Sequence, residues 1–263
     1  MLKKEKILLI LFLALIFSLI LVQQYKPIDI SKDNELILGI SPFTVTIDNE
    51  TGEQIYVTGK AKVLIAHPNE NWRIEEIFDP NGIVAHKAAV GDIDNDGNIE
   101  MVSIYSCVPR DVNDPSKGLL IPINIKKFDF ENGVFNEEII YSINDTDPSN
   151  CFITERSADI GDVDNDGENE LVIGTHEMGI YIIKYNENKW ESNIIDKDPN
   201  AGIHTLIIAD ADGDNRNEII SASDGDNTVK MHEFDGEWIS KDIFNTTKED
   251  ITWAMDFGNV DND

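Results

Sequence analysis

The sequence predicts an all-β protein, a β-propeller of four-stranded blades that follows an N-terminal hydrophobic helix. Three observations predict this fold. A short acidic sequence recurs along the chain, and an aromatic marker recurs with the same period. The runs between them are short and rich in β-branched and aromatic residues, without sustained helical periodicity after Val22. Repeats of roughly 40 to 50 residues are typical of propeller blades. An array of β-sandwiches is the alternative fold.

The acidic sequence occurs in three full copies, which read GDIDNDGNIE at residues 91–100, GDVDNDGENE at 161–170 and ADADGDNRNE at 209–218. A fourth copy begins with GNVDND at residues 258–263, and a degenerate copy, DNETGEQ, occupies residues 48–54. The second residues of the four clear copies, at 92, 162, 210 and 259, lie 70, 48 and 49 residues apart. This spacing predicts repeated structural units.

A large aromatic residue marks the last strand of each predicted unit. It follows a polar turn of hairpin-forming residues and precedes an isoleucine by five positions. The four pairs are Trp72 with Ile77, Phe135 with Ile140, Trp190 with Ile195, and Trp238 with Ile243. Two markers that share one period indicate that every unit has the same order of strands. Around the second full copy we expect strands at residues 158–161, 170–174, 180–185 and 190–195.

Residues 1–25 have the composition of a signal peptide or a membrane anchor. Lys3, Lys4 and Lys6 precede an uncharged apolar run at residues 7–22, and the basic flank predicts that the rest of the chain is extracytoplasmic, either membrane-anchored or secreted. The run is shorter than the roughly 20 residues of a full span, but it lacks a small-x-small cleavage site, which favours an uncleaved anchor. A buried core helix is the alternative. Residues 26–34 are a predicted linker, and residues 35–263 hold the propeller repeats.

The charge balance limits the class of partner. The 263-residue chain has 21 basic and 50 acidic residues, a formal net charge of −29. So negative a surface repels polyanions, which argues against nucleic acid as a partner. Apolar residues make up 41% of the chain, enough to fill a core.

The carboxylates of each full copy fall at positions 1, 3, 5 and 9 of a loop that starts at its first aspartate. Such a turn directs the odd positions inward, where four carboxylates would repel one another without a cation. Hard oxygen ligands in a flexible loop suit Ca²⁺ better than Zn²⁺ or Mg²⁺. The predicted carboxylate ligands are Asp92, Asp94, Asp96 and Glu100; Asp162, Asp164, Asp166 and Glu170; and Asp210, Asp212, Asp214 and Glu218. Position 7 completes each set (Asn98, Glu168 or Arg216), in the first copy through the backbone carbonyl.

The loop sequence has two alternative interpretations, an EF-hand and a turn without an ion. An EF-hand begins with similar letters but needs a bidentate acid at position 12 and flanking helices. Position 12 here is Ser103, Ile173 or Ser221, and strands are predicted on both sides, so an EF-hand is excluded. An ordinary Asp/Asn/Gly turn without an ion suits the degenerate copy at residues 48–54 better than the three full copies.

These loops resemble the calcium loops of FG-GAP and VCBS propellers, the family that includes the integrin α-chain head. The resemblance covers about residues 35–263. It implies about three structural calcium ions on one face of the blades, ligand contacts on the opposite face and a ring of usually about seven blades. The chain supplies about four blades and the start of a fifth, so further C-terminal blades or another chain are expected to close the ring.

The sequence departs from the family pattern at three points. Position 9 is glutamate where the family usually has aspartate, and Asn259 replaces the first aspartate of the fourth copy. Asn215 replaces the position-6 glycine in the third copy. Asparagine tolerates the left-handed backbone conformation, so we expect the third site to survive this change.

A second face of the predicted blades lies at the strand ends remote from the acidic loops. Cys107 and Cys151 are expected on this face of neighbouring blades, where they could form a disulfide; two unpaired thiols are the alternative. An insertion at residues 107–121 lies on the same face, and such insertions often mark a binding surface. Six residues before each loop stand His86, Arg156, His204 and Trp253. They could bind an anionic sugar or a peptide, or they could simply mark where each blade begins.

The sequence leaves more than one function open. The first is a calcium-stabilised scaffold that binds a protein or a glycan, as in adhesion. The second is a carbohydrate-active enzyme of the polysaccharide-lyase or sugar-dehydratase kind, with His86 and His204 as the acid–base residues. The sequence contains no nucleophile elbow, zinc motif or phosphate loop, which favours the scaffold. A spacer between the membrane and another domain is the third.

Overall fold

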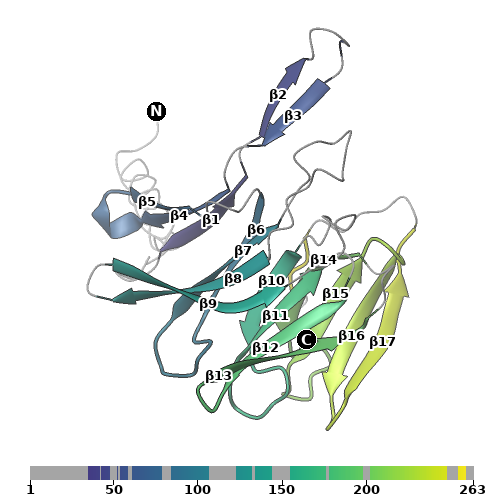
Figure 1. The fold of residues 1–263 in the computed structure, drawn as a ribbon. Helices are drawn as coiled ribbons and strands as arrows, with labels where there is room; N and C mark the ends of the chain where they lie inside the picture. Colours follow the sequence, from purple (N-terminus) through teal and green to yellow (C-terminus); the bar gives the residue numbers. More distant parts are fainter. Residues whose placement is uncertain are drawn as a thin grey trace, which may run out of the picture. The chain divides into compact units, whose positions relative to one another are not determined.

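The computed structural model describes twelve segments of the chain (Figure 1): residues 35–41, 43–47, 52, 54–58, 61–78, 84–106, 123–131, 134–143, 155–175, 178–197, 202–247 and 254–258. The predicted N-terminal segment and linker, the degenerate copy at residues 48–54 for the most part, Cys107, Cys151, Trp253 and the fourth acidic copy after Gly258 lie outside these segments. No described helix is long and apolar enough to cross a membrane.

The chain divides into two compact units, residues 1–36 with 66–74 and residues 37–65 with 75–263. In the described part of the first unit, the 3₁₀ helix η1 (Pro68–Glu70) is followed by Asn71 in the left-handed conformation. An ion pair of 2.6 Å joins His67 Nδ1 to Glu35 Oε1, and another of 2.6 Å joins Arg73 Nε to Glu70 Oε2. The second unit holds the acidic loops.

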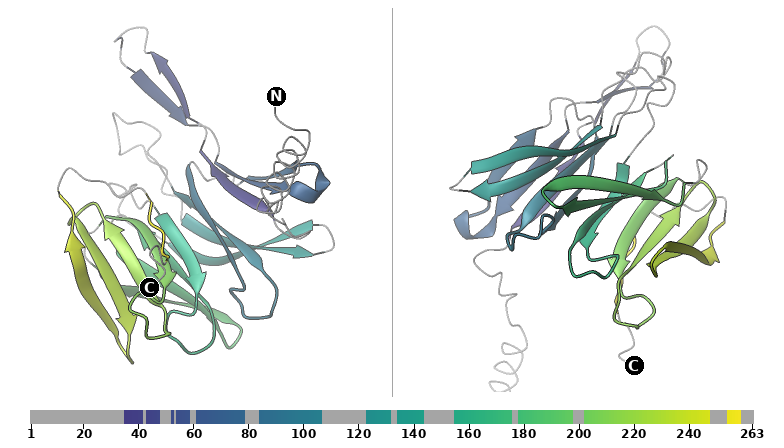
Figure 2. Two further views of the ribbon diagram at one scale, coloured as in Figure 1. Left: turned by 180° about the vertical axis from the view of Figure 1, so that it is seen from behind. Right: turned by 60° about the horizontal axis from the view of Figure 1, so that its bottom comes forward.

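The described residues fold as strands with almost no helix, so the predicted all-β class is confirmed. Three antiparallel four-stranded sheets lie between residues 84 and 245 (Figure 2). They are β6 (Val84–Gly91), β7 (Glu100–Ser106), β8 (Ile123–Glu131) and β9 (Val134–Ile143); β10 (Glu155–Gly161), β11 (Glu170–Thr175), β12 (Ile180–Asn186) and β13 (Lys189–Ile195); and β14 (Ile203–Ala209), β15 (Glu218–Ser223), β16 (Thr228–Phe234) and β17 (Trp238–Asn245). The four strands predicted around the second acidic copy match β10 to β13.

Two smaller sheets precede them. Strands β1 (Leu36–Ile40), β4 (Lys62–His67) and β5 (Arg73–Phe78) form a three-stranded sheet in the order β1-β4-β5. Strands β2 (Phe43–Ile47) and β3 (Gln54–Thr58) pair as an antiparallel hairpin.

Each four-stranded sheet is a meander, with its acidic loop between the first and second strands. The predicted aromatic marker begins the fourth strand and stacks across the hairpin on an aromatic residue of the third. The ring-centroid distances are 4.9 Å for Phe130–Phe135, 4.7 Å for Tyr185–Trp190 and 5.3 Å for Phe234–Trp238. Tilted pairs of this kind add to the stability of a sheet beyond the area they bury. The recurrent aromatic residue therefore closes the third hairpin of each unit.

The core lies between successive sheets. Leu171 and Ile173 of β11 pack in a cluster with Ile104 and Ile125 of the preceding sheet. Val172, between them, packs in a second cluster with residues of the following sheet. Successive residues of a strand point to opposite faces, so the sheet β10–β13 is buried on both faces. This explains why all six residues of β11 are buried and why its sequence is almost continuously apolar.

The first strands of neighbouring sheets, β6 with β10 and β10 with β14, lie in contact. The glycine that opens each of the first two acidic copies makes this approach possible. A Cβ on Gly91 would lie 2.7 Å from Ile160 Cγ2, and a Cβ on Gly161 would lie 3.2 Å from Ile208 Cγ2. The two glycine–isoleucine contacts are equivalent, so in both pairs of sheets the end of the first strand sets the distance to the next sheet.

A buried histidine holds the last described sheet together. His232 of β16 is fully buried, with Nε2 2.8 Å from Ser221 Oγ of β15 and Nδ1 2.8 Å from Ser240 Oγ of β17. Burial lowers its pKa to about 4; nearby Asp196 opposes this shift and Lys230 adds to it. The neutral ring therefore bridges three strands.

This burial predicts a loss of stability in mild acid. The folded pKa of about 4 lies below the unfolded value of about 6.5, so protons bind preferentially to the unfolded chain and stability falls as the pH drops from about 6.5 towards 4. Between pH 7.5 and 5 this group alone should lower the free energy of unfolding by about 2 kcal/mol. Urea unfolding of the wild type and His232→Gln, both in chelator, measures the effect. An equal pH dependence of the two proteins would contradict it.

Candidate metal centre

The three acidic loops adopt one curled conformation. Loop 1 comprises residues 92–100, loop 2 residues 162–170 and loop 3 residues 210–218. The position-1 carboxylate of each loop accepts a hydrogen bond of 3.0 Å from the backbone N–H at position 6. The position-5 carboxylate accepts one of 2.8–3.0 Å from the N–H at position 7, which is Asn98, Glu168 or Arg216. Side chains of the loop itself thus satisfy its exposed amides.

The curl requires the left-handed conformation at two positions. At position 4, φ is 59° for Asn95, 60° for Asn165 and 83° for Gly213. At position 6, φ is 92° for Gly97, 94° for Gly167 and 68° for Asn215. Loop 3 therefore exchanges the asparagine and glycine of the other loops. Asn215 adopts the left-handed conformation expected for it, and loop 3 keeps the same curl.

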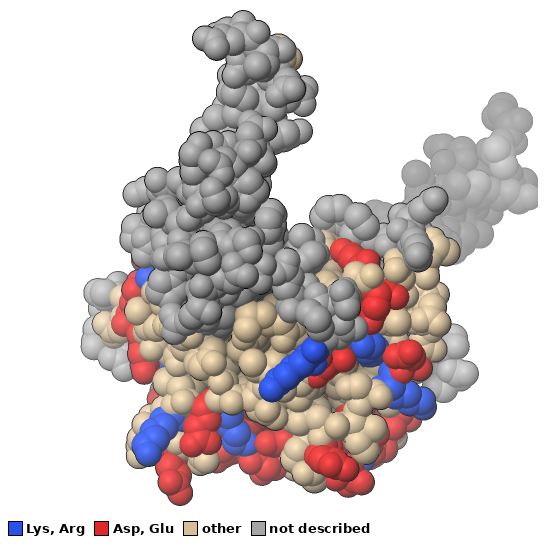
Figure 3. Space-filling view, turned by 45° about the vertical axis from the view of Figure 1, so that its right-hand side comes forward, with Lys and Arg blue, Asp and Glu red and all other residues tan. Residues whose placement is uncertain are grey.

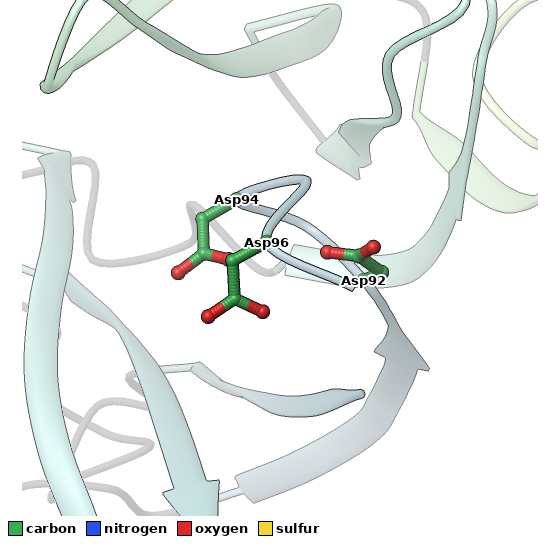
Figure 4. Close-up of side chains that lie close together, drawn as sticks. All are labelled: Asp92, Asp94 and Asp96. Atoms are coloured by element: carbon green, nitrogen blue, oxygen red, sulfur yellow. The ribbon is translucent and has the colours of Figure 1, made fainter. Parts of the chain in front are cut away.

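Carboxylate oxygens converge inside each curl. Within each group, one oxygen per residue lies within 4.8 Å of the others. The groups are Asp92, Asp94 and Asp96 in loop 1, Asp162, Asp164 and Glu170 in loop 2, and Asp210, Asp212 and Glu218 in loop 3. Figure 4 shows the three carboxylates of loop 1 gathered beside the curl. Three of the four carboxylates predicted for each loop are thus brought together; the fourth is Glu100, Asp166 or Asp214.

The position-9 glutamates are the most buried of the acidic groups. Glu100, Glu170 and Glu218 are 3%, 0% and 1% exposed. Each accepts a hydrogen bond of 2.8–3.0 Å from the backbone N–H at position 2 of its loop. Burial, with a smaller contribution from neighbouring aspartates, raises the pKa of Glu100 to about 7 and raises those of Glu170 and Glu218. Each site thus places a carboxylate where ionisation is unfavourable without a cation.

The donor set fits a calcium ion. Oδ1 of Asp92 and Oδ1 of Asp94 are buried and have no hydrogen-bond partner among the described residues. Buried oxygens of this kind are normally satisfied, so these two have unused acceptor capacity within the acidic group of loop 1. Oxygen-only donors on a flexible loop are what Ca²⁺ takes in proteins. When bound, the ion would neutralise the carboxylates and hold the curl closed.

A different basic residue contacts each loop. Lys127 Nζ lies 2.5 Å from Asp94 and 3.1 Å from Asp129 at loop 1, beside a cavity of about 240 Å³. At loop 3, Arg216 Nε and Nη2 lie 2.9 Å and 2.8 Å from Asp214 and Glu233. Lys127 was missed in the sequence because its contact with loop 1 depends on the register of the third strand, whereas Arg216 is the predicted position-7 residue of loop 3 itself.

Lys184 at loop 2 reaches furthest into its group of acids. Its Nζ lies 2.5 Å from Asp166, 2.9 Å from Glu170 and 3.2 Å from Asp164. Burial lowers its pKa, but the hydrogen bonds to Asp166 and Glu170 raise it more, so the ammonium stays charged. Lys184 lies on the third strand opposite the position-9 glutamate of its loop. The third strands of the other two sheets, β8 and β16, have the acidic residues Asp129 and Glu233 at the equivalent position. At this position loop 2 therefore has the Lys184 ammonium among its carboxylates, whereas loops 1 and 3 have a further carboxylate nearby.

Asparagines join neighbouring loops. Asn169 N donates to Asn95 Oδ1 at 2.8 Å, Asn95 Nδ2 donates to Asn169 O at 3.4 Å, and Asn169 Nδ2 donates to Asp92 O at 2.8 Å. Asn217, Asn165 and Asp162 repeat the pattern between loops 2 and 3, at 3.1, 3.5 and 2.9 Å. We call each such set of three hydrogen bonds an amide clasp. The recurrence of asparagine at positions 4 and 8 was the only sequence signal for it.

The residues six positions before each loop lie at equivalent β-bulges. The register of the first two strands shifts across His86, Arg156 and His204 in the three sheets, so each is the extra residue of its first strand. His204 is 8% exposed, with Nε2 3.9 Å from Asp224 Oδ2. Bulges commonly redirect a side chain. Their recurrence fits the interpretation that these residues mark where each blade begins, and the burial of His204 favours a structural role for it.

Comparison with known sequences supports the repeat. The model of the FG-GAP-like repeat family matches residues 162–221, a span that contains loops 2 and 3. No curated protein matches the chain significantly. The matched span begins at the first aspartate of loop 2 and ends in β15, so it covers both acidic loops and the strands β11 to β14 between them. Residues 162–221 are therefore similar in sequence to an FG-GAP-like repeat.

Proposed function

We propose that this chain is an extracytoplasmic β-propeller scaffold that is stabilised by calcium and binds a protein or a glycan. The observation that carries the proposal is the threefold recurrence of one curled loop with converging carboxylates. Unpartnered buried oxygens in loop 1 and the family match over loops 2 and 3 support it. Calcium has a structural role here, because each loop joins the first and second strands of its sheet.

The propeller ring is part of the proposal. Successive four-stranded sheets pack face to face with their first strands in contact, as blades around an axis do. The last described sheet carries a further apolar cluster, in which Ile220, Ala222 and Val229 pack with Met255 from the segment that follows. We infer that this face receives the next blade, and that further blades or another chain close the ring.

The charge of the chain supports a protein or glycan partner over a nucleic acid. Acidic side chains line the lower border of the described surface in Figure 3, with basic side chains between them. The formal charge of −29 opposes a polyanion. We place the ligand contacts on the face remote from the acidic loops, near the bulges at His86 and Arg156 and the insertion at residues 107–121. The basic, apolar segment at residues 1–25 supports export.

Calcium removal tests the central claim. Extracellular calcium modules often bind at about 10⁻⁴ to 10⁻³ M, so about 10 mM calcium should stabilise the fold by about 1.4–2.7 kcal/mol per site. We expect the thermal midpoint to rise by several degrees over that in chelator, and to rise less in Asp162→Ala. Glu191→Ala, an exposed charge-matched control on β13, should respond as the wild type does. A folded protein whose midpoint ignores calcium would contradict the proposal.

The lysine in loop 2 predicts unequal calcium sites. Its ammonium lies 2.5–3.2 Å from Asp164, Asp166 and Glu170, where it repels an incoming cation. Lys184→Met should therefore strengthen calcium binding at loop 2, by roughly tenfold if about 1.4 kcal/mol of repulsion is removed, and lower the thermal midpoint in chelator. Calorimetric titration measures the affinity. Lys230→Met, which breaks a pair with Asp196 outside the loops, is the matched control. Equal effects of the two variants would refute a specific competition.

Substitutions at the bulge residues distinguish a ligand-binding scaffold from the alternative, a carbohydrate-active enzyme. His86→Ala combined with Arg156→Ala should weaken capture on a glycan array or by an extracellular protein panel at least several-fold, without altering the response to calcium. Lys189→Ala, in the β12–β13 hairpin on the loop side, should leave capture unchanged. Polysaccharide turnover that disappears in His86→Ala and His204→Ala, with capture retained, would instead favour the carbohydrate-active enzyme.

A further inference from the structure

The amide clasps connect groups that belong to different acidic loops. In each clasp the position-4 asparagine of one loop accepts from, and donates to, the backbone at position 8 of the next loop. The position-8 asparagine in turn donates to the carbonyl of the position-1 aspartate in the preceding loop, at 2.8 Å and 2.9 Å. Three hydrogen bonds therefore cross each junction between loops.

Every clasp residue is adjacent to a predicted calcium ligand. Asn95 lies between Asp94 and Asp96, and Asn169 immediately precedes the buried Glu170. The carbonyl that Asn169 contacts belongs to Asp92, the first ligand of loop 1. A shift of the backbone that carries the ligands of one loop must therefore strain or break bonds to the next loop.

The clasps are confined to the three full loops in the described part of the chain. Position 8 of loop 1 is Ile99, which is 65% exposed and has no amide side chain. Position 4 of loop 3 is Gly213, which has no side chain to offer a following loop. Loop 2 alone among the described loops has asparagine at both positions, Asn165 and Asn169, so it is linked on both sides.

We propose that the amide clasps couple calcium binding at loops 1, 2 and 3, with loop 2 as the transmitter. The inference rests on the proposed calcium binding and deepens it. Calcium in one loop fixes the curl that presents its position-4 and position-8 groups, which holds the neighbouring loop in its binding-competent form. Coupling is reciprocal, so loss of calcium at one end lowers the affinity at the other loops.

The experiment removes one site and breaks one clasp in the full chain. Asp212→Asn disables loop 3, and Asn165→Gly removes two of the three hydrogen bonds of the clasp between loops 2 and 3. Glycine is the native residue at this position of loop 3, where φ is 83°, so the left-handed backbone is retained. Asn215→Gly is the matched control, since it makes the same change at a left-handed position that takes no part in a clasp. Calcium affinity is measured by calorimetric titration, and folding by the thermal midpoint in chelator.

We expect Asp212→Asn to weaken calcium binding at the remaining loops by about fivefold or more. The same substitution should have no such effect in the Asn165→Gly background and its full effect in the Asn215→Gly background. Equal weakening in all three backgrounds, or none in any of them, overturns the coupling while leaving calcium binding in place. A wild type that binds no calcium would instead remove the proposed function itself. If Asn165→Gly does not fold, Asn217→Ala removes the third hydrogen bond of the same clasp, from Asn217 Nδ2 to Asp162 O, and should reduce the coupling in part.

Discussion

The close approach of the first strands is the constraint on which the rest of the structure depends. Gly91 and Gly161 let the first strand of the next sheet pack against backbone, and the contacts to Ile160 and Ile208 repeat from sheet to sheet. Because every acidic loop begins directly after this contact, the spacing of the sheets is also the spacing of the loops. Side chains of one loop can thus reach the backbone of the next, and the core clusters can fill both faces of the middle sheet.

The loops share a sequence pattern but differ in their electrostatic surroundings. Each buries a position-9 glutamate whose pKa is raised by burial. The neighbouring basic group differs from loop to loop. Loop 1 has Lys127 of the third strand, which contacts Asp94, and loop 2 has Lys184 of the third strand, which contacts the buried Glu170 itself. Loop 3 has Arg216, which lies in the loop. The conformation of the loop is therefore a property of the repeat, whereas its charge balance is a property of the individual sheet.

Much of the fold can be predicted from the sequence, because two independent markers recur in every repeat. The acidic copies mark the first hairpin and the aromatic residues mark the third, so the strands around loop 2 are predicted closely. Strand β10 starts three residues earlier than expected because its pairing with β11 continues across the bulge at Arg156. The left-handed Asn215 also follows from local chemistry. The clasps and Lys184 do not, because both depend on distances between segments that are brought together only by sheet packing and strand register. The outcome for Cys107, Cys151 and Trp253 lies outside the described residues.

The complete burial of β11 bears on the smallest part of the protein that can exist on its own. All six of its residues are buried, and its alternate side chains enter two different clusters. A single four-stranded sheet cut from the chain would expose apolar surface on both faces and two open edges, a combination that promotes association between molecules. Folding must then be a collective property of several adjacent sheets, in which each one is completed by its neighbours. A boundary drawn at the ends of one sequence repeat would divide a cooperative unit, although the repeat is the natural unit of the sequence.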